Sequence, residues 1–272
     1  MESKHINKNL KRKLQLTQLK IAKEIKRICE KNNIKYFLDA GSMLGAVRHK
    51  GFIPWDDDMD IGMLKEDYDK FLKIAPKELG EEFFLDNYKI DKTYGLVFSK
   101  VKLKNTKYIE KIASKNAEHQ EIFVDIFPYF NVPEDEKIRK KQGKKLKLLA
   151  HVFMAQSGIK VWKNNKGISK LKFLPIIILG KILNKDKVYK NIDKIINKKI
   201  KSNLVGIHDG MSYNYLYFKK EYLNDFIDIE FEDDLFKIPK EYDKILKIDY
   251  GDYMKLPPKD KRVTHEILEL KC

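Results

Sequence analysis

Cysteine and long apolar runs are what this chain of 272 residues has least of. The only two cysteines, Cys29 and Cys272, provide neither a disulfide framework nor a cysteine-rich metal cluster. No run approaches the roughly 18 apolar residues that span a bilayer, and the longest, residues 173–180, lies between two lysines. The N-terminal residues are polar and lysine-rich, without the apolar segment of a secretory signal. These absences predict a cytoplasmic protein.

Positive charge is abundant, and lysine carries most of it. The chain has 56 Lys and Arg residues against 40 Asp and Glu residues, a formal net charge of +16. Such an excess favours nucleic acid, an anionic membrane surface or a phosphate-bearing substrate as partner. The composition of an AT-rich genome explains the same excess equally well. Because arginine is scarce and few aromatic residues are interleaved with the basic runs, we expect no nucleic-acid partner.

Apolar periodicity predicts the helices. We expect helices over roughly 5–31, 43–49 and 66–74, the last ending before Pro76. Residues 134–200 are predicted to be helical around a loop at 164–169. Their apolar stripes are Leu146, Leu149 and Val152, and then Val188, Ile192, Ile195, Ile196 and Ile200.

Short apolar segments predict the strands. They lie at 36–38, 57–63, 83–88, 97–103, 122–127, 213–218, 231–238 and 248–256. With hydrophobic residues at 43%, a sizeable core is expected. The order of elements predicts an α+β fold: a mixed-sheet core with its N-terminal helix (1–133), a helical insertion (134–205), and a C-terminal α/β extension that packs back on the core (206–272).

Two carboxylates stand two positions apart, at Asp58 and Asp60. In a strand these side chains point to one face, while Met59 and Ile61 point to the other. Neighbouring carboxylates repel each other unless a cation lies between them. Mg²⁺ prefers oxygen ligands and commonly bridges a protein to substrate phosphates. A solvated acidic loop is the alternative, but the interleaved apolar residues favour a phosphate-transfer site.

A third carboxylate, Asp125, interrupts the apolar run at 122–127. A charge in a buried strand is costly unless it is paired or bound to metal. One interpretation is a core residue that accepts hydrogen bonds from a helix N-terminus. Because two other carboxylates are available, we prefer a third metal ligand.

Several segments resemble the signature of the LicD-type phosphotransferases. They are Gly-Ser-Met-Leu-Gly-Ala-Val-Arg at 41–48, Ile-Pro-Trp-Asp-Asp-Asp-Met-Asp-Ile at 53–61, Asp-Tyr at 67–68, Val-Asp-Ile-Phe-Pro at 124–128 and Tyr-Gly-Asp-Tyr-Met-Lys-Leu-Pro-Pro at 250–258. The resemblance covers about residues 30–130 and 230–266. It implies a nucleotidyltransferase-like core, in which a Gly-Ser turn binds phosphate and three acidic residues hold metal. The gap between Ser42 and Asp58 is long for the general superfold but similar to the LicD pattern.

The resemblance also implies an activity. It is the transfer of a phospho-substituted group, such as phosphocholine from CDP-choline, to a sugar hydroxyl of a glycan, teichoic-acid or lipopolysaccharide precursor. The similar fukutin-related proteins handle ribitol phosphate, so the fold does not fix the donor. Asp58, Asp60 and Asp125 would hold Mg²⁺ or Mn²⁺, and Asp125 could accept the proton of the attacking hydroxyl. Backbone N–H groups at Gly41 and Ser42 would approach phosphate.

Four further residues have two interpretations each. Arg48 is either a phosphate clamp or a solvated arginine. Lys102, which alternates with Lys100 on one strand face, either adds positive charge to the site or is solvated. Trp55 either stacks on a base or a choline cation, or belongs to the core. His265, just past the C-terminal motif, either reaches the site or is a surface residue.

The expected partners are a CDP-linked donor and a glycan or lipid-linked oligosaccharide acceptor. The basic surface and the apolar patch near Pro175 would suit peripheral contact with an anionic inner leaflet. Two alternatives remain. One is a nucleotidyltransferase that releases pyrophosphate from a nucleoside triphosphate. The other is a non-enzymatic, basic nucleic-acid-binding module, although three carboxylates without metal would repel a phosphate backbone.

Overall fold

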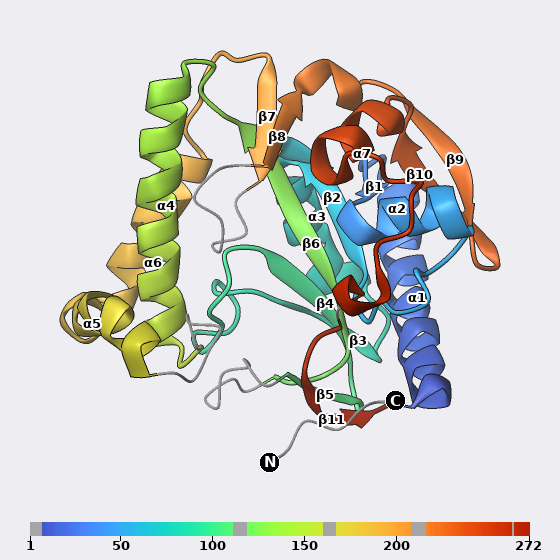
Figure 1. Cartoon of the computed structure of the whole chain (residues 1–272), viewed down its shortest axis with the longest axis horizontal. Coiled ribbons are helices and arrows are strands. Elements are labelled where there is room, and N and C mark those ends of the chain that lie inside the picture. Colours follow the sequence, from blue (N-terminus) through green and yellow to red (C-terminus); the bar gives the residue numbers. More distant parts are fainter. Residues whose placement is uncertain (1–6, 111–118, 160–166, 208–215, 263) are drawn as a thin grey trace.

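A mixed β-sheet is the centre of the fold, with helices on its faces and a separate group of helices at one side (Figure 1). The structure is a computed structural model that describes residues 7–110, 119–159, 167–207, 216–262 and 264–272. The mixed sheet and the surrounding helices confirm the predicted α+β class.

The sheet places two strands that are distant in sequence side by side. Its first five strands lie in the order β1 (Phe37–Leu38), β2 (Asp60–Leu64), β6 (Phe123–Asn131), β4 (Ser99–Leu103) and β3 (Phe83–Asp86). The end of β6 also pairs with β7 (Leu204–Ile207), which pairs with β8 (Leu216–Lys219). Only β2 and β6 run parallel, and their register places Asp60 opposite Asp125. The parallel register therefore brings together two of the predicted metal ligands.

Helices α1 (Lys8–Lys31) and α3 (Lys65–Glu78) pack on the sheet and on each other. Asn7 begins α1, because its side chain accepts a hydrogen bond from the backbone N–H of Leu10 at 2.8 Å. The helix then buries an apolar stripe at Leu14, Leu19, Ile21, Ala22, Ile25 and Ile28. This burial anchors the sheet on which the carboxylates stand.

Helices α2 (Ala40–His49) and α7 (Tyr242–Tyr250) pack against each other beside the β2 end of the sheet (Figure 1). The hairpin of β9 (Phe226–Phe231) and β10 (Asp234–Pro239) lies next to them. A further pair joins β5 (Lys107–Glu110) to β11 (Ile267–Lys271). Short 3₁₀ helices occupy Lys220–Leu223 and Lys259–Lys261.

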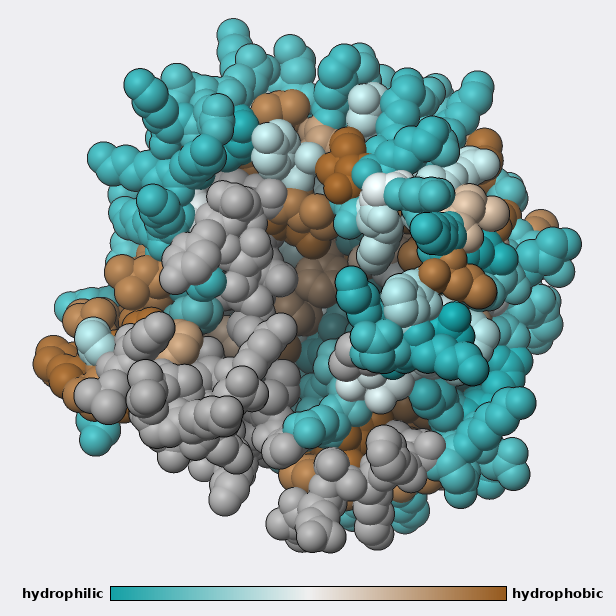
Figure 2. All heavy atoms as spheres, in the orientation of Figure 1, coloured by the Kyte–Doolittle hydropathy of each residue, from teal (hydrophilic) through white to brown (hydrophobic). Residues whose placement is uncertain are grey.

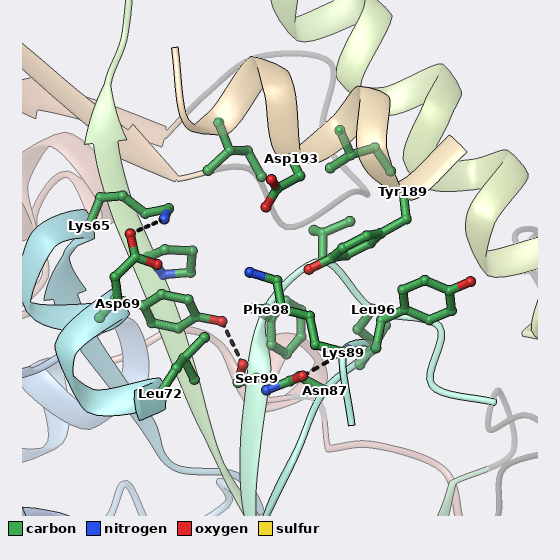
Figure 3. A pocket seen from close by; sticks show the side chains of 16 residues that line it. Lys65, Asp69, Leu72, Asn87, Lys89, Leu96, Phe98, Ser99, Tyr189 and Asp193 are labelled. Atoms are coloured by element: carbon green, nitrogen blue, oxygen red, sulfur yellow. Dashed lines mark hydrogen bonds and ion pairs between the residues drawn. The ribbon is translucent and has the colours of Figure 1, made fainter. Parts of the chain in front are cut away.

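The helical group contains α4 (Glu136–Gln156), α5 (Gly167–Ile182) and α6 (Lys185–Ile196). It has its own hydrophobic cluster, to which both predicted apolar stripes contribute. Figure 3 shows where this group meets the core: a cavity of about 30 Å³ lies between α3, β4 and α6, with the Tyr68 and Ser99 hydroxyls 2.5 Å apart on its wall. A cavity of this size holds about one water. The group therefore packs closely on the core. Within the described residues, no helix is both long and apolar enough to cross a bilayer.

Several predicted boundaries are wrong. The strand predicted at 248–256 is instead the end of α7 and a turn, which Gly251 allows by its φ of 65°. Helix α3 does not end before Pro76 but continues to Glu78, and the Leu79 N–H bonds to the Ala75 carbonyl. The segment 231–238 is not one strand but parts of both hairpin strands.

Other differences concern β6, the missed strands and the insertion. Strand β6 runs on to Asn131, and Pro128 is tolerated because it lies between the residues that pair with β4 and those that pair with β7. Strands β5, β7 and β11 were not predicted, and β7 begins within the predicted helical insertion 134–205. Residues 167–169 of the predicted loop at 164–169 are helical, and residues 164–166 lie outside the described residues. Residues 5–6 of the predicted helix at 5–31 and residues 213–215 of the predicted strand at 213–218 also lie outside them.

Candidate active site

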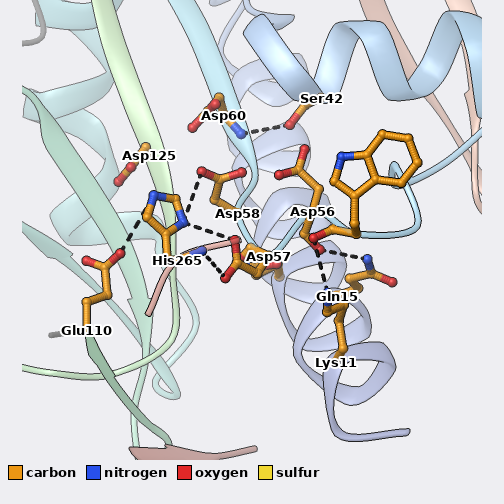
Figure 4. Close-up of polar contacts among 12 residues, drawn as sticks. Lys11, Gln15, Ser42, Asp56, Asp57, Asp58, Asp60, Glu110, Asp125 and His265 are labelled. Carbon is orange, nitrogen blue, oxygen red and sulfur yellow. Dashed lines mark hydrogen bonds and ion pairs between the residues drawn. The ribbon is translucent and has the colours of Figure 1, made fainter. Parts of the chain in front are cut away.

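The carboxylates gather where the chain enters β2. Asp56 to Met59 form an extended loop, so the predicted strand begins only at Asp60. Met59 is fully buried, and its carbonyl accepts a hydrogen bond from the Asp125 N–H at 3.0 Å. This bond and the β2–β6 register hold Asp60 and Asp125 next to each other. Figure 4 shows Asp56, Asp58 and Asp60 lying around one small space near Asp125.

Burial, with repulsion between neighbouring carboxylates, raises the pKa of several aspartates in this cluster. Burial, together with the charges of Asp58, Asp125, Asp39 and Asp56, raises the pKa of Asp60 well above its ordinary value. Burial and Asp58 raise the pKa of Asp56 to about 8. The cluster therefore has more negative charge than its surroundings compensate.

Lys100 provides one positive charge on this cluster. Its Nζ lies 2.5 Å from Oδ1 of Asp125, and both side chains are nearly buried. Burial raises the pKa of Asp125 to about 6 despite the opposing effect of this ammonium. Among the described residues, no lysine or arginine forms an ion pair with Asp60.

The Gly41-Ser42 segment is the first turn of α2 and not a free turn, which corrects the prediction. Asp39 caps the helix: its carboxylate accepts from the Ala40 N–H at 2.9 Å and its carbonyl from the Met43 N–H at 3.0 Å. Within the described residues, no acceptor is bonded to the N–H of Gly41 or Ser42. These two N–H groups are therefore available to an anion at the helix N-terminus.

Glycine is required at position 41 by close contact. A Cβ there would lie 2.8 Å from Oδ2 of Asp56, so any side chain would push this carboxylate away. The Ser42 hydroxyl accepts a hydrogen bond from the Asp60 N–H at 2.9 Å, which ties α2 to the start of β2. Ser42 thus positions the cluster by accepting through its side chain, and its backbone N–H remains for phosphate.

His265 reaches the site, and Asp57 holds it there. Both Asp57 oxygens bond to His265, one to the backbone N–H and one to Nδ1, each at 3.0 Å. His265 Nδ1 also lies 3.8 Å from Asp58, and Nε2 lies 3.9 Å from Glu110. The bond to Asp57, with the charges of Glu110 and Asp58, raises the pKa of His265 to about 10. A positively charged imidazole therefore faces Asp58.

The β5–β11 pair explains how a residue so late in the chain reaches the cluster. Ile267 pairs with Glu110, so the residues just before β11 pass directly beside the carboxylates. The backbone alone brings His265 and Glu110 together. Residues 107–110 and 267–271 lack the strict alternation of a half-buried strand, so the sequence carried no clear signal for this pair.

Arg48 and Trp55 lie on the other side of the cluster, next to Arg262. The Arg48 guanidinium donates to the Tyr253 carbonyl at 2.6 Å, and burial lowers its pKa. Arg262 stacks on the Trp55 ring, 4.6 Å from its centroid. Trp55 is also partly buried against the main core, as the core interpretation expects, and its stacking on a base or a choline cation stays a prediction. Arg48 is not a solvated arginine, because it fixes the C-terminal motif 250–258 on α2.

Lys102 has a different environment from the one predicted. It is buried, lies 2.6 Å from the Asp86 carboxylate and donates to the His119 carbonyl at 2.9 Å. Desolvation lowers its pKa although Asp86 opposes this effect. The ammonium of Lys102 is already bonded inside the protein. Lys102 is therefore neither on a solvated face nor free to bind phosphate.

The roles of several site residues were not predicted. Asp56 and Asp57 stood in the predicted motif without a role, and Lys100 was expected either to add positive charge or to be solvated, without its contact to Asp125. Glu110 and Arg262 had no signal of their own, because the β5–β11 pair and the turn after α7 bring them to the site.

The donor set fits a divalent cation. Oxygens of Asp56, Asp57 and Asp58 lie within 4.8 Å of one another, but both oxygens of Asp57 are bonded to His265. Asp58, Asp60 and Asp125, with Asp56 beside them, supply only carboxylate oxygens, which Mg²⁺ and Mn²⁺ prefer. The raised pKa values of Asp56 and Asp60 show that the cluster lacks positive charge.

Comparison with known proteins agrees with this geometry. The family model of the LicD/FKTN/FKRP nucleotidyltransferase domain matches residues 33–165. Lipopolysaccharide cholinephosphotransferase LicD of Haemophilus influenzae is 33% identical over 265 residues, covering 95% of this chain and 96% of that protein. Human ribitol 5-phosphate transferase FKRP is 37% identical over 59 residues, covering 22% of this chain and 12% of that protein. An uncharacterized protein of Rickettsia typhi is 50% identical over 72 residues, covering 26% of this chain and 23% of that protein. Similarity along nearly the whole chain and a carboxylate cluster beside a helix N-terminus lead to one conclusion: this chain belongs to the LicD family and is a LicD-like phosphotransferase.

Proposed function

We propose that this enzyme transfers phosphocholine from CDP-choline to a sugar hydroxyl of a cell-surface glycan precursor. The observation that carries the proposal is the convergence of Asp58, Asp60 and Asp125 beside the free N–H groups of α2. The Haemophilus influenzae relative, which matches nearly the whole chain, is named a lipopolysaccharide cholinephosphotransferase. This name supports the choice of donor and acceptor.

Asp58, Asp60 and Asp125 would hold Mg²⁺ or Mn²⁺, which neutralises the charge that develops on the diphosphate as its bond breaks. The N–H groups of Gly41 and Ser42 bind a phosphate oxygen at the positive end of the α2 dipole. Asp125 accepts the proton of the attacking hydroxyl, and Lys100 keeps that carboxylate oriented. His265 compensates the charge of Asp58.

The nucleotide half of the donor fits on the side of Arg48, Arg262 and Trp55. Two guanidinium groups lie there, and the Trp55 ring offers a flat apolar face. Arginines bind phosphate oxygens well, and an indole ring stacks on a base. The diphosphate then lies over the carboxylates, between the nucleotide and the group that is transferred.

The acceptor is proposed to be lipid-linked and to be reached at an anionic membrane, at the inner face of the cell membrane. The exposed face of α5 is aliphatic, with Leu174, Ile178 and Ile182 each about half or more exposed. Figure 2 shows apolar atoms gathered over this part of the surface. The helix has no acidic residue and is flanked by lysines, which suits an anionic headgroup layer.

The test is a screen of CDP-linked donors with Mg²⁺, in which released CMP is measured. We expect CMP from CDP-choline even without acceptor, because water can replace the sugar hydroxyl weakly. Asp125→Asn should lower both this hydrolysis and transfer to an acceptor. Consumption of nucleoside triphosphates with release of pyrophosphate, and no reaction with CDP-linked donors, would replace the proposal with the nucleotidyltransferase alternative.

A further inference from the structure

A cavity of about 290 Å³ opens beside Asp58, Asp125 and His265, on the side of these carboxylates that β4, β5 and β6 form. Residues 91–98 and the end of α4 close it. The face of the molecule shown in Figure 2 is hollowed near its middle, with apolar atoms inside the hollow. The cavity is close in size to small-molecule sites. A group attached to a phosphate on the carboxylates would extend into it.

Aromatic rings form much of the wall. They are Tyr94, Phe98, Tyr108, Phe123 and Phe127. The Phe98 and Phe127 rings lie 4.4 Å apart. The Lys100 ammonium lies 3.1 Å from the Phe123 centroid and 5.5 Å from that of Phe98. These ring faces therefore already accept a cation, as the negative face of an aromatic ring does in general.

The cavity is negative in a chain of net charge +16. Six carboxylates line it against two lysines and the charged imidazole of His265; the carboxylates are Asp58, Asp86, Asp91, Glu110, Glu121 and Asp125, and the lysines are Lys100 and Lys102. Both lysines are paired, with Asp125 and with Asp86. The lining thus has an excess of negative charge that selects a cation over an anion.

Unpaired polar atoms on the wall point to a missing ligand. The hydroxyls of Tyr94 and Tyr108 and Oε2 of Glu121 are buried, and none has a hydrogen-bond partner within the described residues. Oε1 of Glu121 lies 3.6 Å from Nδ1 of His119. The Glu121 carboxylate therefore offers the cavity negative charge that a cation without N–H can offset, while the two hydroxyls leave hydrogen-bonding capacity for water or for a polar part of the ligand.

We propose that this cavity binds a quaternary ammonium group, the head group of the transferred phosphocholine. Such a group is bulky and weakly hydrated and has no N–H, so aromatic faces with a nearby carboxylate suit it better than hydrogen-bond donors do. The donor would then be oriented by its charges. Its anionic nucleotide half would lie towards Arg48 and Arg262, and its cationic head group towards Glu121. The assignment of this cation to a donor rests on the proposed function, but the binding of a quaternary ammonium in the cavity does not.

The experiment measures binding of choline chloride to the full chain by saturation-transfer NMR, with 3,3-dimethylbutan-1-ol as the neutral isostere and ribitol as the polyol. We expect choline to bind about tenfold more tightly than the isostere, because the two differ only in charge. Glu121→Gln and Phe98→Leu should each weaken choline binding about fivefold or more. The matched control Glu82→Gln changes an exposed, ion-paired carboxylate on the surface and should leave binding unchanged.

Three outcomes would overturn the inference: equal binding of choline and its isostere, tighter binding of ribitol, or unchanged choline binding in a folded Glu121→Gln. The donor screen separates this inference from the proposed function. Release of CMP from CDP-ribitol but not from CDP-choline would keep the transferase and overturn the head-group site. Glu121-dependent choline binding without CMP release from any CDP-linked donor would keep the site and overturn the transferase.

Discussion

At the carboxylate cluster, burial and the charges of neighbouring aspartates make Asp56 and Asp60 harder to ionise. The raised pKa of Asp60 means that its charged form, which the proposed metal site would use, destabilises the folded protein. A substitution that removes one of these charges should therefore separate stability from activity.

We expect Asp58→Asn and Asp60→Asn to lower transfer about 100-fold or more while the melting temperature stays equal or rises. Each change keeps the shape of the side chain but removes one charge from the cluster. Added Mg²⁺ should raise the melting temperature of the unmodified protein and not that of the variants. Asp233→Asn, on the exposed hairpin turn, is the matched control. Near-normal transfer by either folded variant would exclude that residue from the mechanism.

For Lys102 we expect substitution to lower the stability of the fold, because its ion-pair partner Asp86 is buried. Lys102→Met should lower the free energy of unfolding by about 3–5 kcal/mol, since it leaves an unpaired buried carboxylate. The double variant with Asp86→Leu should recover much of this loss. Urea denaturation of both, with Lys104→Met as an exposed control, measures the effect. Loss of activity without loss of stability in Lys102→Met would restore its predicted role at phosphate.

At the scale of elements, the β9–β10 hairpin is attached to α1 and α2 through Glu232. Its carboxylate pairs with Arg12 and accepts from the Phe52 N–H at 3.0 Å. Position 51 must be glycine, because a Cβ would lie 2.4 Å from this carboxylate. One side chain thus joins three segments.

The stability that Glu232 contributes should depend on pH. The bond to Arg12 lowers its folded pKa below the ordinary value of 4.5. A lowered folded pKa gives stability that is present above the unfolded pKa and is lost as the pH falls through the folded pKa. Thermal unfolding between about pH 6 and pH 3 should therefore show a steeper loss for the unmodified protein than for Glu232→Gln. Parallel curves for the two proteins would contradict this account.

Elements with strong local periodicity were predictable, and elements defined by distant partners were not. Helix α1 and the apolar stripes of α4 and α6 follow from the spacing of their own residues. Strands β5 and β11 are four and five residues long, and only their pairing with each other defines them. The end of α7 was misread because Ile248, Tyr250 and Met254 stand an even number of residues apart, as on one face of a strand.

The same division holds at the site. Asp60 and Asp125 could be selected from the sequence because each stands between apolar residues, and Asp58 because it lies two positions before Asp60. The ion pair of Lys102 with Asp86 depends on the register of β3 and β4. The contact of His265 with Asp57 depends on the path of the loop after α7. Local patterns carry no information on such contacts.

At the scale of the whole molecule, the excess of positive charge and the α5 surface predict salt-dependent membrane binding. Anionic liposomes should bind the protein at low salt and release much of it at physiological salt, whereas neutral liposomes should bind little. Leu174→Ser with Ile178→Ser should weaken binding, and the matched pair Ile90→Ser with Leu235→Ser, equally exposed elsewhere, should not. Equal binding to both liposomes, or self-association through α5 in light scattering, would contradict the membrane assignment.

The pairing of β5 with β11 has a consequence for the protein as it is made. A ribosome releases the carboxylates long before His265 and the strand that carries it into place. Until residues 267–271 emerge, the nascent chain has its aspartates without the imidazolium that compensates Asp58. We therefore expect the rest of the fold to form first during synthesis, and the active site to be completed last, once residues 265–271 have left the ribosome.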